Sequence, residues 1–386
     1  MNVPKLRFKE FNDEYKSIKL KDVSEIYDGT HETPNYVEKG VKFVSVENIS
    51  NLLDTTKFIP ESDYNKYKIK PKYNDVFMTR IGDIGTSSIY KSDEKLAYYV
   101  SLALLRTKDN HILIPDYLNQ YIKNISFQKE LYNRTIHVAF PKKINTGEIG
   151  ECSINLCSDK EQLKVSNFLS LLDKKIELQS KKIEDLKLFK LYTENSLLNS
   201  SNSIHWKKLK LNDILIEGNK EPVKNTNNFK KITIKLNLNG LEFNESKREM
   251  SDKRPFYIRE ENEIIIGKQN YFNGSIAIVT KEFSGCICSN AIMSFKVKEG
   301  YNLKYIYLYL SQKRYMKERE FLANGTGQKE LSEKEFLKFT IKVPEDSVVN
   351  NITNIIDKIN KKINFENNKL NKLIELKKGL MQNMFV

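Results

Sequence analysis

The residues of this chain best suited to chemistry are polar side chains gathered near glycines and lysines in four short segments. They are Arg80, Ser87 and Ser88 around the turn at 82–85; Arg134, His137, Lys142 and Lys143; Lys268, Asn270, Tyr271 and Asn273 before Gly274; and Asn324, Thr326, Gln328 and Lys329. Arg, Lys, Asn and Gln side chains form paired hydrogen bonds with the edges of guanine and adenine. Glycine lets a backbone approach closely. The four segments are therefore candidates for contact with DNA bases, and the alternative for each residue is a solvated loop side chain.

Three further cations, Lys72, Arg106 and Arg254, are better suited to phosphates, where a point charge suffices and no base is read. The composition favours a polyanionic partner, because 64 Lys and Arg residues against 50 Asp and Glu residues leave a net charge of +14 at pH 7. Such a surplus attracts nucleic acid and speeds association with it. A basic chain can also lack any nucleic-acid role, so the charge supports the polar segments but does not decide the function.

Motifs that would make the chain a catalyst are missing from the sequence. It contains neither a Gly-x-x-x-x-Gly-Lys-Ser/Thr loop for ATP nor a Gly-x-Gly-x-x-Gly turn for a dinucleotide. Its four histidines stand singly, without the spacing of metal ligands. No run approaches the roughly 18 apolar residues of a membrane span, and residues 1–11 lack the apolar core of a signal peptide. We therefore expect a cytoplasmic DNA reader with no catalytic residue, metal or cofactor of its own.

The elements that would position these segments include a heptad pattern that occurs twice. Its apolar seam positions are Leu169, Leu172, Ile176, Ile183 and Leu186 in the first copy, and Ile356, Ile359, Ile363, Leu370 and Leu373 in the second. Each position recurs about 187 residues later, and so do the interruptions: Gln179 matches Glu366, and Lys190 matches Lys377. Chance periodicity would not reproduce its own interruptions. The chain is therefore a tandem repeat.

A fainter repeat links the segments that precede the two helices. Leu20-Lys21-Asp22-Val23 parallels Leu211-Asn212-Asp213-Ile214, Asn74-Asp75-Val76 parallels Asn262-Glu263-Ile264, and Gly85 parallels Gly274. These matches predict five parts: a first domain at 1–157, a long helix at 158–198, a linker at 199–204, a second domain at 205–344 and a second long helix at 345–386. Helical stretches at 115–131 and 303–321 occupy equivalent places in the two domains.

A long helix with an apolar seam must bury that seam, and the chain supplies one partner helix of matching length. Because a whole domain separates the helices, the second can run back along the first. The predicted fold is therefore α+β: two similar mixed α/β domains separated by two long helices that form an antiparallel intramolecular coiled coil, with pseudo-twofold symmetry. The alternatives are that each helix packs on its own domain or pairs with another copy of the chain.

Several stretches resemble the specificity subunit of Type I restriction-modification systems. Pro4-Lys5-Leu6-Arg7-Phe8, with Phe11 and Tyr15, looks like the start of that family. Residues 168–179 resemble its central conserved helix, and residues 376–385 resemble its C-terminal end. Residues 325–332, followed by 341–344, look like the end of a target recognition domain. The corresponding stretch at 135–140 is only loosely similar.

This resemblance implies that each domain is a target recognition domain for one half of a bipartite DNA site. The helix pair would set the gap between the halves and dock two modification subunits. Those subunits would bring S-adenosylmethionine and methylate adenine, and restriction subunits would add cleavage driven by ATP and Mg²⁺. A non-catalytic scaffold that binds protein or polymer ligands across a rigid spacer is the alternative, and it leaves the positive charge unexplained. A self-contained nuclease or methyltransferase is disfavoured by the missing motifs.

Overall fold

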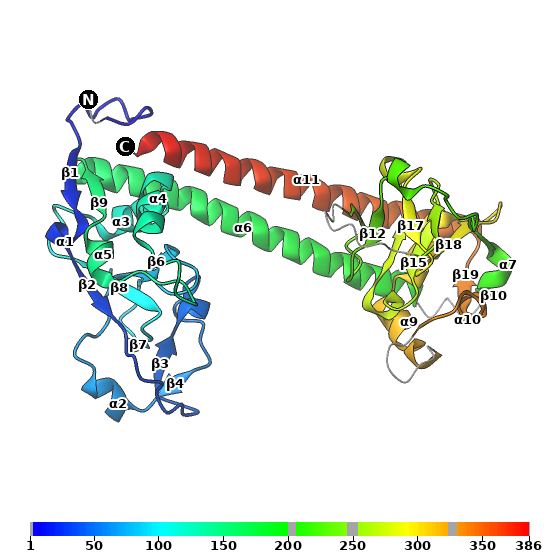
Figure 1. Ribbon diagram of the computed structural model, residues 1–386, viewed down its shortest axis with the longest axis horizontal. Helices are drawn as coiled ribbons and strands as arrows, with labels where there is room; N and C mark the ends of the chain where they lie inside the picture. The colour runs from blue at the N-terminus through cyan, green and yellow to red at the C-terminus, as the bar shows by residue number, and fades with distance from the viewer. Residues whose placement is uncertain (1–2, 200–205, 245–253, 323–329, 386) are drawn as a thin grey trace. The chain divides into compact units, whose positions relative to one another are not determined.

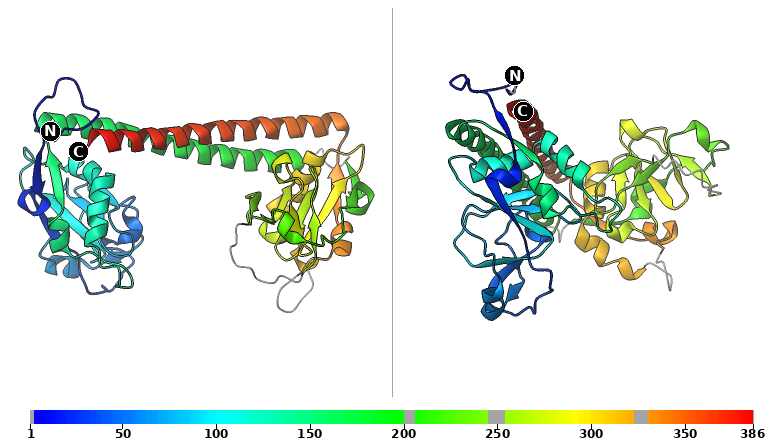
Figure 2. Two further views of the ribbon diagram at one scale, coloured as in Figure 1. Left: turned by 45° about the horizontal axis from the view of Figure 1, so that its top comes forward. Right: turned by 60° about the vertical axis from the view of Figure 1, so that its left-hand side comes forward.

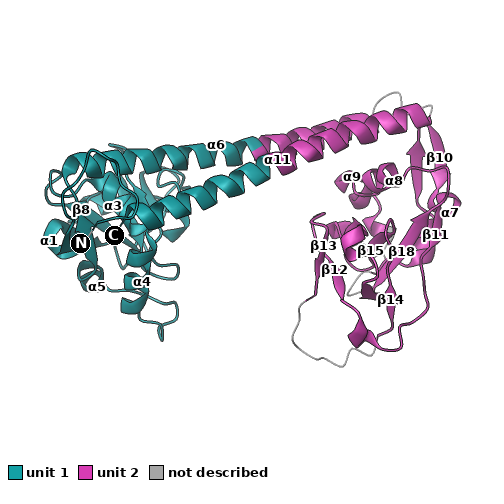
Figure 3. Ribbon diagram, turned by 90° about the horizontal axis from the view of Figure 1, so that it is seen from above, with its two compact units in different colours: residues 1–182, 366–386 teal, residues 183–365 magenta. Residues whose placement is uncertain are grey.

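The computed structural model describes residues 3–199, 206–244, 254–322 and 330–385, which form two compact units (Figure 3). The first unit contains residues 1–182 and 366–386, and the second contains residues 183–365. The division falls inside the two long helices, α6 (Asp159–Leu198) and α11 (Asp346–Met384). Each unit therefore holds one globular part and one portion of each helix.

The globular part of the first unit is built on a four-stranded antiparallel sheet. Its strands, in spatial order, are β2 (Ser24–Asp28), β8 (Leu102–Thr107), β5 (Val76–Thr79) and β6 (Ser87–Ile89). Strand β5 is buried on both faces: Val76 and Met78 pack into one hydrophobic cluster, and Phe77 packs into another. Successive strand residues point to opposite faces, so a strand between two cores needs an unbroken apolar sequence.

Other elements flank this sheet in the first unit. The strands are β1 (Lys16–Lys19) paired with β9 (Ser153–Leu156), and a three-stranded sheet of β4 (Phe58–Ile59), β3 (Val41–Val44) and β7 (Leu96–Tyr98). The helices are α1 (Leu20–Val23), α2 (Glu61–Lys66), α3 (Pro115–Ile122), α4 (Ile125–Arg134) and α5 (Thr146–Gly150). The helix expected at 115–131 is thus two helices, because Asn124 has an extended backbone and starts α4 as its N-cap.

The second unit repeats the plan. Its four-stranded sheet has the order β11 (Leu215–Glu217), β18 (Ile292–Val297), β15 (Ile264–Gly267) and β16 (Ile276–Ile278), and β10 (Lys207–Lys210) pairs with β19 (Thr340–Val343). The other strands are β12 (Ile232–Ile234), β13 (Leu241–Phe243), β14 (Phe256–Ile258) and β17 (Ile287–Ser289). The helices are α7 (Leu211–Ile214), α8 (Leu303–Leu310), α9 (Lys313–Lys317) and α10 (Glu333–Leu337).

Equivalent positions in the two units share unusual backbone conformations. Asn74 and Asn262, which precede β5 and β15, have φ angles of 74° and 68°. Gly85 and Gly274, in the turns that follow these strands, have φ angles of 94° and 77°. Left-handed backbone is common only for Gly and, less often, Asn or Asp. The matched strand order and matched φ angles confirm the tandem repeat of mixed α/β domains.

The long helices pack as the heptad pattern predicts. In each unit the portions of α6 and α11 lie side by side and run in opposite directions (Figure 1). None of the ten apolar seam residues is exposed, and Leu169, Ile183, Ile356, Ile363 and Leu373 are buried. The predicted antiparallel helix pair is therefore confirmed within each unit. Among the helices of the described residues, none has the length and apolarity needed to cross a membrane.

The polar interruptions of the seam are paired in the first unit. Gln179 Nε2 donates hydrogen bonds to the backbone oxygen of Glu366 at 3.0 Å and to its Oε2 at 2.8 Å. Lys182 Nζ lies 2.8 Å from Glu366 Oε1. Gln179 and Glu366 are equivalent residues of the repeat, 187 positions apart. The contact therefore joins equivalent positions of the two copies of the heptad pattern.

A second polar cluster joins α3 to both long helices in the first unit. Lys377 forms an ion pair with Asp173, and Gln120 Nε2 donates to Asp173 Oδ2 at 2.9 Å. Burial alone would raise the pKa of Asp173, but hydrogen bonds from Lys377 and Gln120 outweigh it, so the pKa is lowered. Near the start of the described chain, the Leu6 N–H donates to the Asn383 carbonyl at 2.8 Å, so the first and last described stretches lie together (Figure 2).

Candidate nucleic-acid interface

In the first unit, two of the sequence-predicted segments are joined by main-chain hydrogen bonds. The Gly82 N–H, in the turn between β5 and β6, donates to the Lys142 carbonyl at 2.8 Å. The Ile144 N–H donates to the Arg80 carbonyl at 3.0 Å. Gly82 has a φ of 83°, so the turn takes a conformation that suits glycine. The turn and residues 136–143, called here the tip segment, therefore form one surface.

The tip segment projects from this surface. Ile136 pairs with Lys143 across its base, and the Ile136 N–H donates to the Lys143 carbonyl at 2.8 Å. Lys142 and Lys143 are exposed. His137 is exposed as well; its Nε2 lies 2.9 Å from the Tyr132 carbonyl, and the two rings are 4.3 Å apart. The predicted residues His137, Lys142 and Lys143 are thus exposed on a segment whose two ends are joined by the Ile136–Lys143 pairing.

Two other predicted residues of this region are held inside the domain. Arg80 is only 6% exposed; its Nε donates to the Ile144 carbonyl, and its Nη1 lies 2.9 Å from Asp28 Oδ1. Ser87 is buried and its hydroxyl donates to Asn119 Oδ1 at 2.9 Å. These side chains stabilise the sheet, and this placement argues against direct base contact. Ser88, beside them, is half-buried.

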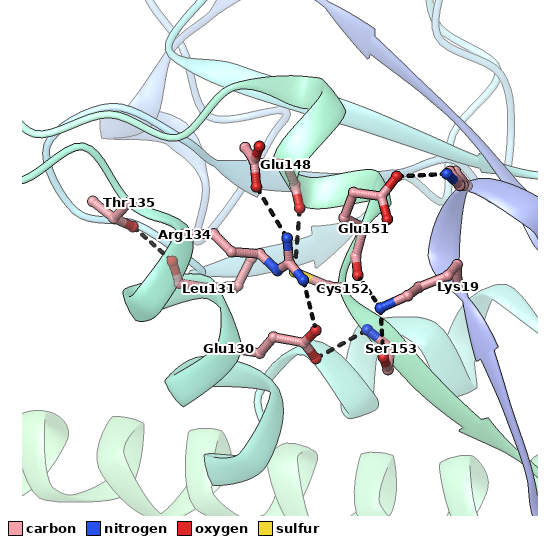
Figure 4. Close-up of polar contacts among 10 residues, drawn as sticks. Lys19, Glu130, Leu131, Arg134, Thr135, Glu148, Glu151, Cys152 and Ser153 are labelled. Carbon is pink, nitrogen blue, oxygen red and sulfur yellow. Dashed lines mark hydrogen bonds and ion pairs between the residues drawn. The ribbon is translucent and has the colours of Figure 1, made fainter.

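The predicted arginines of the first unit are also engaged in ion pairs. Arg106 Nε and Nη2 donate to the two carboxylate oxygens of Asp75, which raises the pKa of Arg106. Arg134 Nη1 donates to Glu148 at 3.0 Å, and Glu130 accepts from its Nη2 (Figure 4). Neither guanidinium is free to neutralise a phosphate without breaking a pair. Lys72 is exposed, and its backbone N–H donates to Asp75.

In the second unit, the turn between β15 and β16 carries the predicted asparagines. Asn270 and Asn273 are exposed, and Asn273 Nδ2 donates to Asn270 Oδ1 at 3.2 Å. Gly274 follows with a φ of 77°, and a Cβ there would lie 3.0 Å from the Leu238 backbone nitrogen. Tyr271, by contrast, is fully buried and its hydroxyl donates to the Leu310 carbonyl at 2.8 Å. Burial raises its pKa well above the usual value, and Tyr271 is a core residue.

Lys268 lies at a polar cavity of about 210 Å³ that the sequence did not predict. Its Nζ is 3.7 Å from Glu333, which also pairs with Lys220. The cavity is further lined by Asn219, Tyr257, Arg259 and Asn290. These residues are scattered along the sequence, so no local pattern signals them. Arg254 is exposed, while Asn324, Thr326, Gln328 and Lys329 lie outside the described residues.

The two units tether equivalent segments in the same way. In the second unit, the Leu331 N–H donates to the Lys268 carbonyl at 2.9 Å, as the Ile144 N–H does to the Arg80 carbonyl in the first. Each bond joins a residue that closely follows the second or the fourth predicted segment to the residue directly after the central strand, β5 or β15. In both units a main-chain tether therefore holds the residue directly after the central strand, and the side chains on the turn that follows differ between the units.

Comparisons with known proteins agree with this arrangement. The family model for the Type I restriction modification DNA specificity domain matches residues 12–188 and again residues 203–376. The S subunit of a Type I restriction-modification system from M. genitalium aligns over 100% of this chain and 99% of its own, with a TM-score of 0.62 and 14% identity. A chain from a structure of type I R-M complex assembly covers 96% of this chain and 97% of its own, with a TM-score of 0.57 and 11% identity.

At these identities the structural likeness concerns the fold, and a comparison with curated proteins found no match. The family model carries more weight, because its two matches together cover most of the sequence and fall on the two copies of the repeat. On this evidence the chain belongs to the family of Type I restriction-modification DNA specificity subunits.

Proposed function

We propose that each globular part reads one half of a bipartite DNA target, and that the helix pair sets the unread gap. The observation that carries this proposal is the same tether after the central strand in both units, at Ile144–Arg80 and Leu331–Lys268, with the same strand order and different exposed side chains on the turn that follows. In the first unit the readers are Ser88, His137, Lys142 and Lys143. In the second they are Asn270, Asn273 and the segment that precedes Leu331. Lys72 and Arg254 contact phosphates.

The long helices dock two modification subunits in this proposal. Leu178 and Phe365 are equivalent in the repeat, as are Phe189 and Leu376, and all four are at least half exposed. Along each helix the two residues are eleven positions apart, about three turns, and so share a face. Leu178 and Leu376 belong to the first unit, and Phe189 and Phe365 belong to the second. A repeated apolar pair on each unit fits two copies of one partner.

The chemistry then belongs to the partners. Modification subunits bind S-adenosylmethionine and methylate adenine, and restriction subunits bind ATP and Mg²⁺. This chain contributes recognition and spacing without catalysis, in the cytoplasm. An exposed Leu or Phe face adds nothing to the stability of a solitary chain, and burying it against a partner is favourable by about 25 cal/mol per Å² of apolar area.

The test is to express this chain with its modification subunit and map methylated adenines by single-molecule sequencing. The expected result is a bipartite motif with a fixed gap, and exchange of residues 205–344 for another second domain should change one half only. A complex that assembles and binds S-adenosylmethionine, yet methylates no defined sequence, would refute the proposal.

Docking is tested separately by stoichiometry. Replacing Leu178 and Leu376 with serine should reduce the complex from two modification subunits to one, measured by native mass spectrometry. Lys174→Ser, an exposed change on the same helix, is the control and should keep both. If the double replacement retains two subunits, these residues are not the docking site.

A further inference from the structure

The tip segment of the first unit carries two apolar side chains that the fold does not use. Val138 is 97% exposed and Phe140 is 103% exposed, the largest exposed fractions among the large apolar residues of the described chain. A side chain at this exposure buries no area and contributes nothing to the core. Exposed single apolar residues are common, but two of this extent at one tip are not accounted for by packing.

The backbone beneath these side chains is held firmly. The base of the tip segment is closed by the Ile136–Lys143 pairing, and the Lys142 carbonyl accepts from the Gly82 N–H. The segment is therefore anchored to the turn of the four-stranded sheet at the point where it leaves the domain. An apolar group presented on an anchored segment loses little conformational entropy when it binds.

The surroundings of Phe140 favour nucleic acid as its partner. Lys142 and Lys143 follow it and are exposed, so phosphates can be neutralised next to the ring. His137 and Tyr132 add two solvent-facing rings, with centroids 4.3 Å apart. Proteins that insert Phe or similar apolar side chains between base steps combine such a wedge with basic residues that hold the backbone.

We propose that Phe140 inserts at a base step of the half-site read by the first unit and partly unstacks it, with Val138 packing beside it. This inference rests on the proposed function, since it assumes that the first unit reads DNA. The equivalent segment of the second unit has Asn324, Thr326, Gln328 and Lys329 in its sequence and no aromatic residue between 323 and 330. The insertion is therefore assigned to the first half-site, where Val138 and Phe140 are fully exposed.

The experiment uses the complete complex of this chain with its modification subunits and a duplex bearing the mapped target. A 2-aminopurine base is placed at each step of the first half-site in turn. The wild-type complex should raise the fluorescence at one step. Phe140→Ala should abolish that rise and weaken binding by about 5- to 150-fold, the range for loss of one base–aromatic stack. Phe140→Trp should restore both readouts.

Controls separate this inference from misfolding. Because Phe140 is fully exposed, Phe140→Ala should leave the melting temperature unchanged. Ile112→Ala, a loop residue of the same unit that is 48% exposed, should leave both fluorescence and affinity as in the wild type. If Phe140→Ala keeps wild-type fluorescence and affinity, the wedge is refuted. If affinity falls but no step of the wild-type complex brightens, Phe140 makes a surface contact and insertion is refuted as well.

Failure of the proposed function looks different. If the wild-type complex methylates no bipartite site, the proposed function is refuted, and this inference is refuted with it. If the wild-type complex methylates such a site and Phe140→Ala keeps wild-type fluorescence and affinity, only the insertion of Phe140 is refuted.

Discussion

Replacing Gln179 with leucine tests how much the hydrogen bonds between Gln179 and Glu366 contribute to the stability of the helix pair. Glu366 is 1% exposed and Gln179 is 6% exposed, so water does not replace the lost amide. The variant removes two hydrogen bonds to Glu366, one at 2.8 Å to the carboxylate and one at 3.0 Å to the backbone. A hydrogen bond to a charged group contributes about 1.5–3 kcal/mol, and we expect a loss of unfolding free energy in that range.

The same pair predicts the outcome of the complementary changes. Glu366→Leu removes the carboxylate acceptor of the buried Gln179 amide, leaves only the backbone oxygen of residue 366 as acceptor, and should cost about 1–3 kcal/mol. The double variant replaces both partners by apolar side chains, which should be close to neutral or stabilising. Lys182, which also pairs with Glu366, is 49% exposed and returns to water at little cost.

Urea unfolding of the full-length chain measures these differences as shifts in midpoint at constant slope. The control is Glu177→Leu, an exposed position on the same helix, which should change stability by less than about 0.5 kcal/mol. The reasoning fails if the double variant loses the sum of the two single losses within about 0.5 kcal/mol, because independent residues add and coupled ones do not.

Three other outcomes are expected. Inserting four residues, about one helical turn, within 193–197 should lengthen the unread gap in methylation maps; altered half-site bases with the old gap would contradict a spacer role. Ile183→Ala should lower the free energy of unfolding by about 2–5 kcal/mol, measured in urea. Because the pKa of Asp173 is lowered in the fold, its pairing with Lys377 and Gln120 stabilises above the unfolded pKa of about 3.9 and is lost as pH falls through the folded value. The melting temperatures of wild type and Asp173→Asn should therefore differ at neutral pH and converge below about pH 4; a constant difference would count against this.

The helix pair was predictable from the sequence because the pattern that defines it, the spacing of apolar side chains, is local. A 3.5-residue spacing of apolar side chains defines a seam whatever lies elsewhere, and the copied interruptions at Gln179 and Glu366 fixed the repeat. The split of the expected helix at 115–131 was less visible, since the change at Asn124 involves only one extended residue. The position of that break depends on packing rather than on any strong breaker.

The candidate interface was predicted only in part, because residue type does not say whether a polar group is already paired. Arg80 donates a hydrogen bond to the carbonyl of Ile144 and forms an ion pair with Asp28, and both partners are distant in sequence. Arg106 is paired with Asp75, and Tyr271 is buried in the core. One local signal was available for the tip segment: the apolar run 138–140 between His137 and the two lysines at 142 and 143.

The two main-chain tethers that follow the central strands have a consequence for how such proteins diverge. Ile144 is bound to Arg80, and Leu331 to Lys268, through main-chain N–H and carbonyl groups alone. A bond of this kind is formed by any residue except proline at the donor position, so it survives substitution of the side chains around it. The side chains around each tether can therefore change while the tether itself remains. The DNA sequence preference can therefore change at little cost in the stability of the fold. The preference for one half-site can change while the preference for the other stays the same.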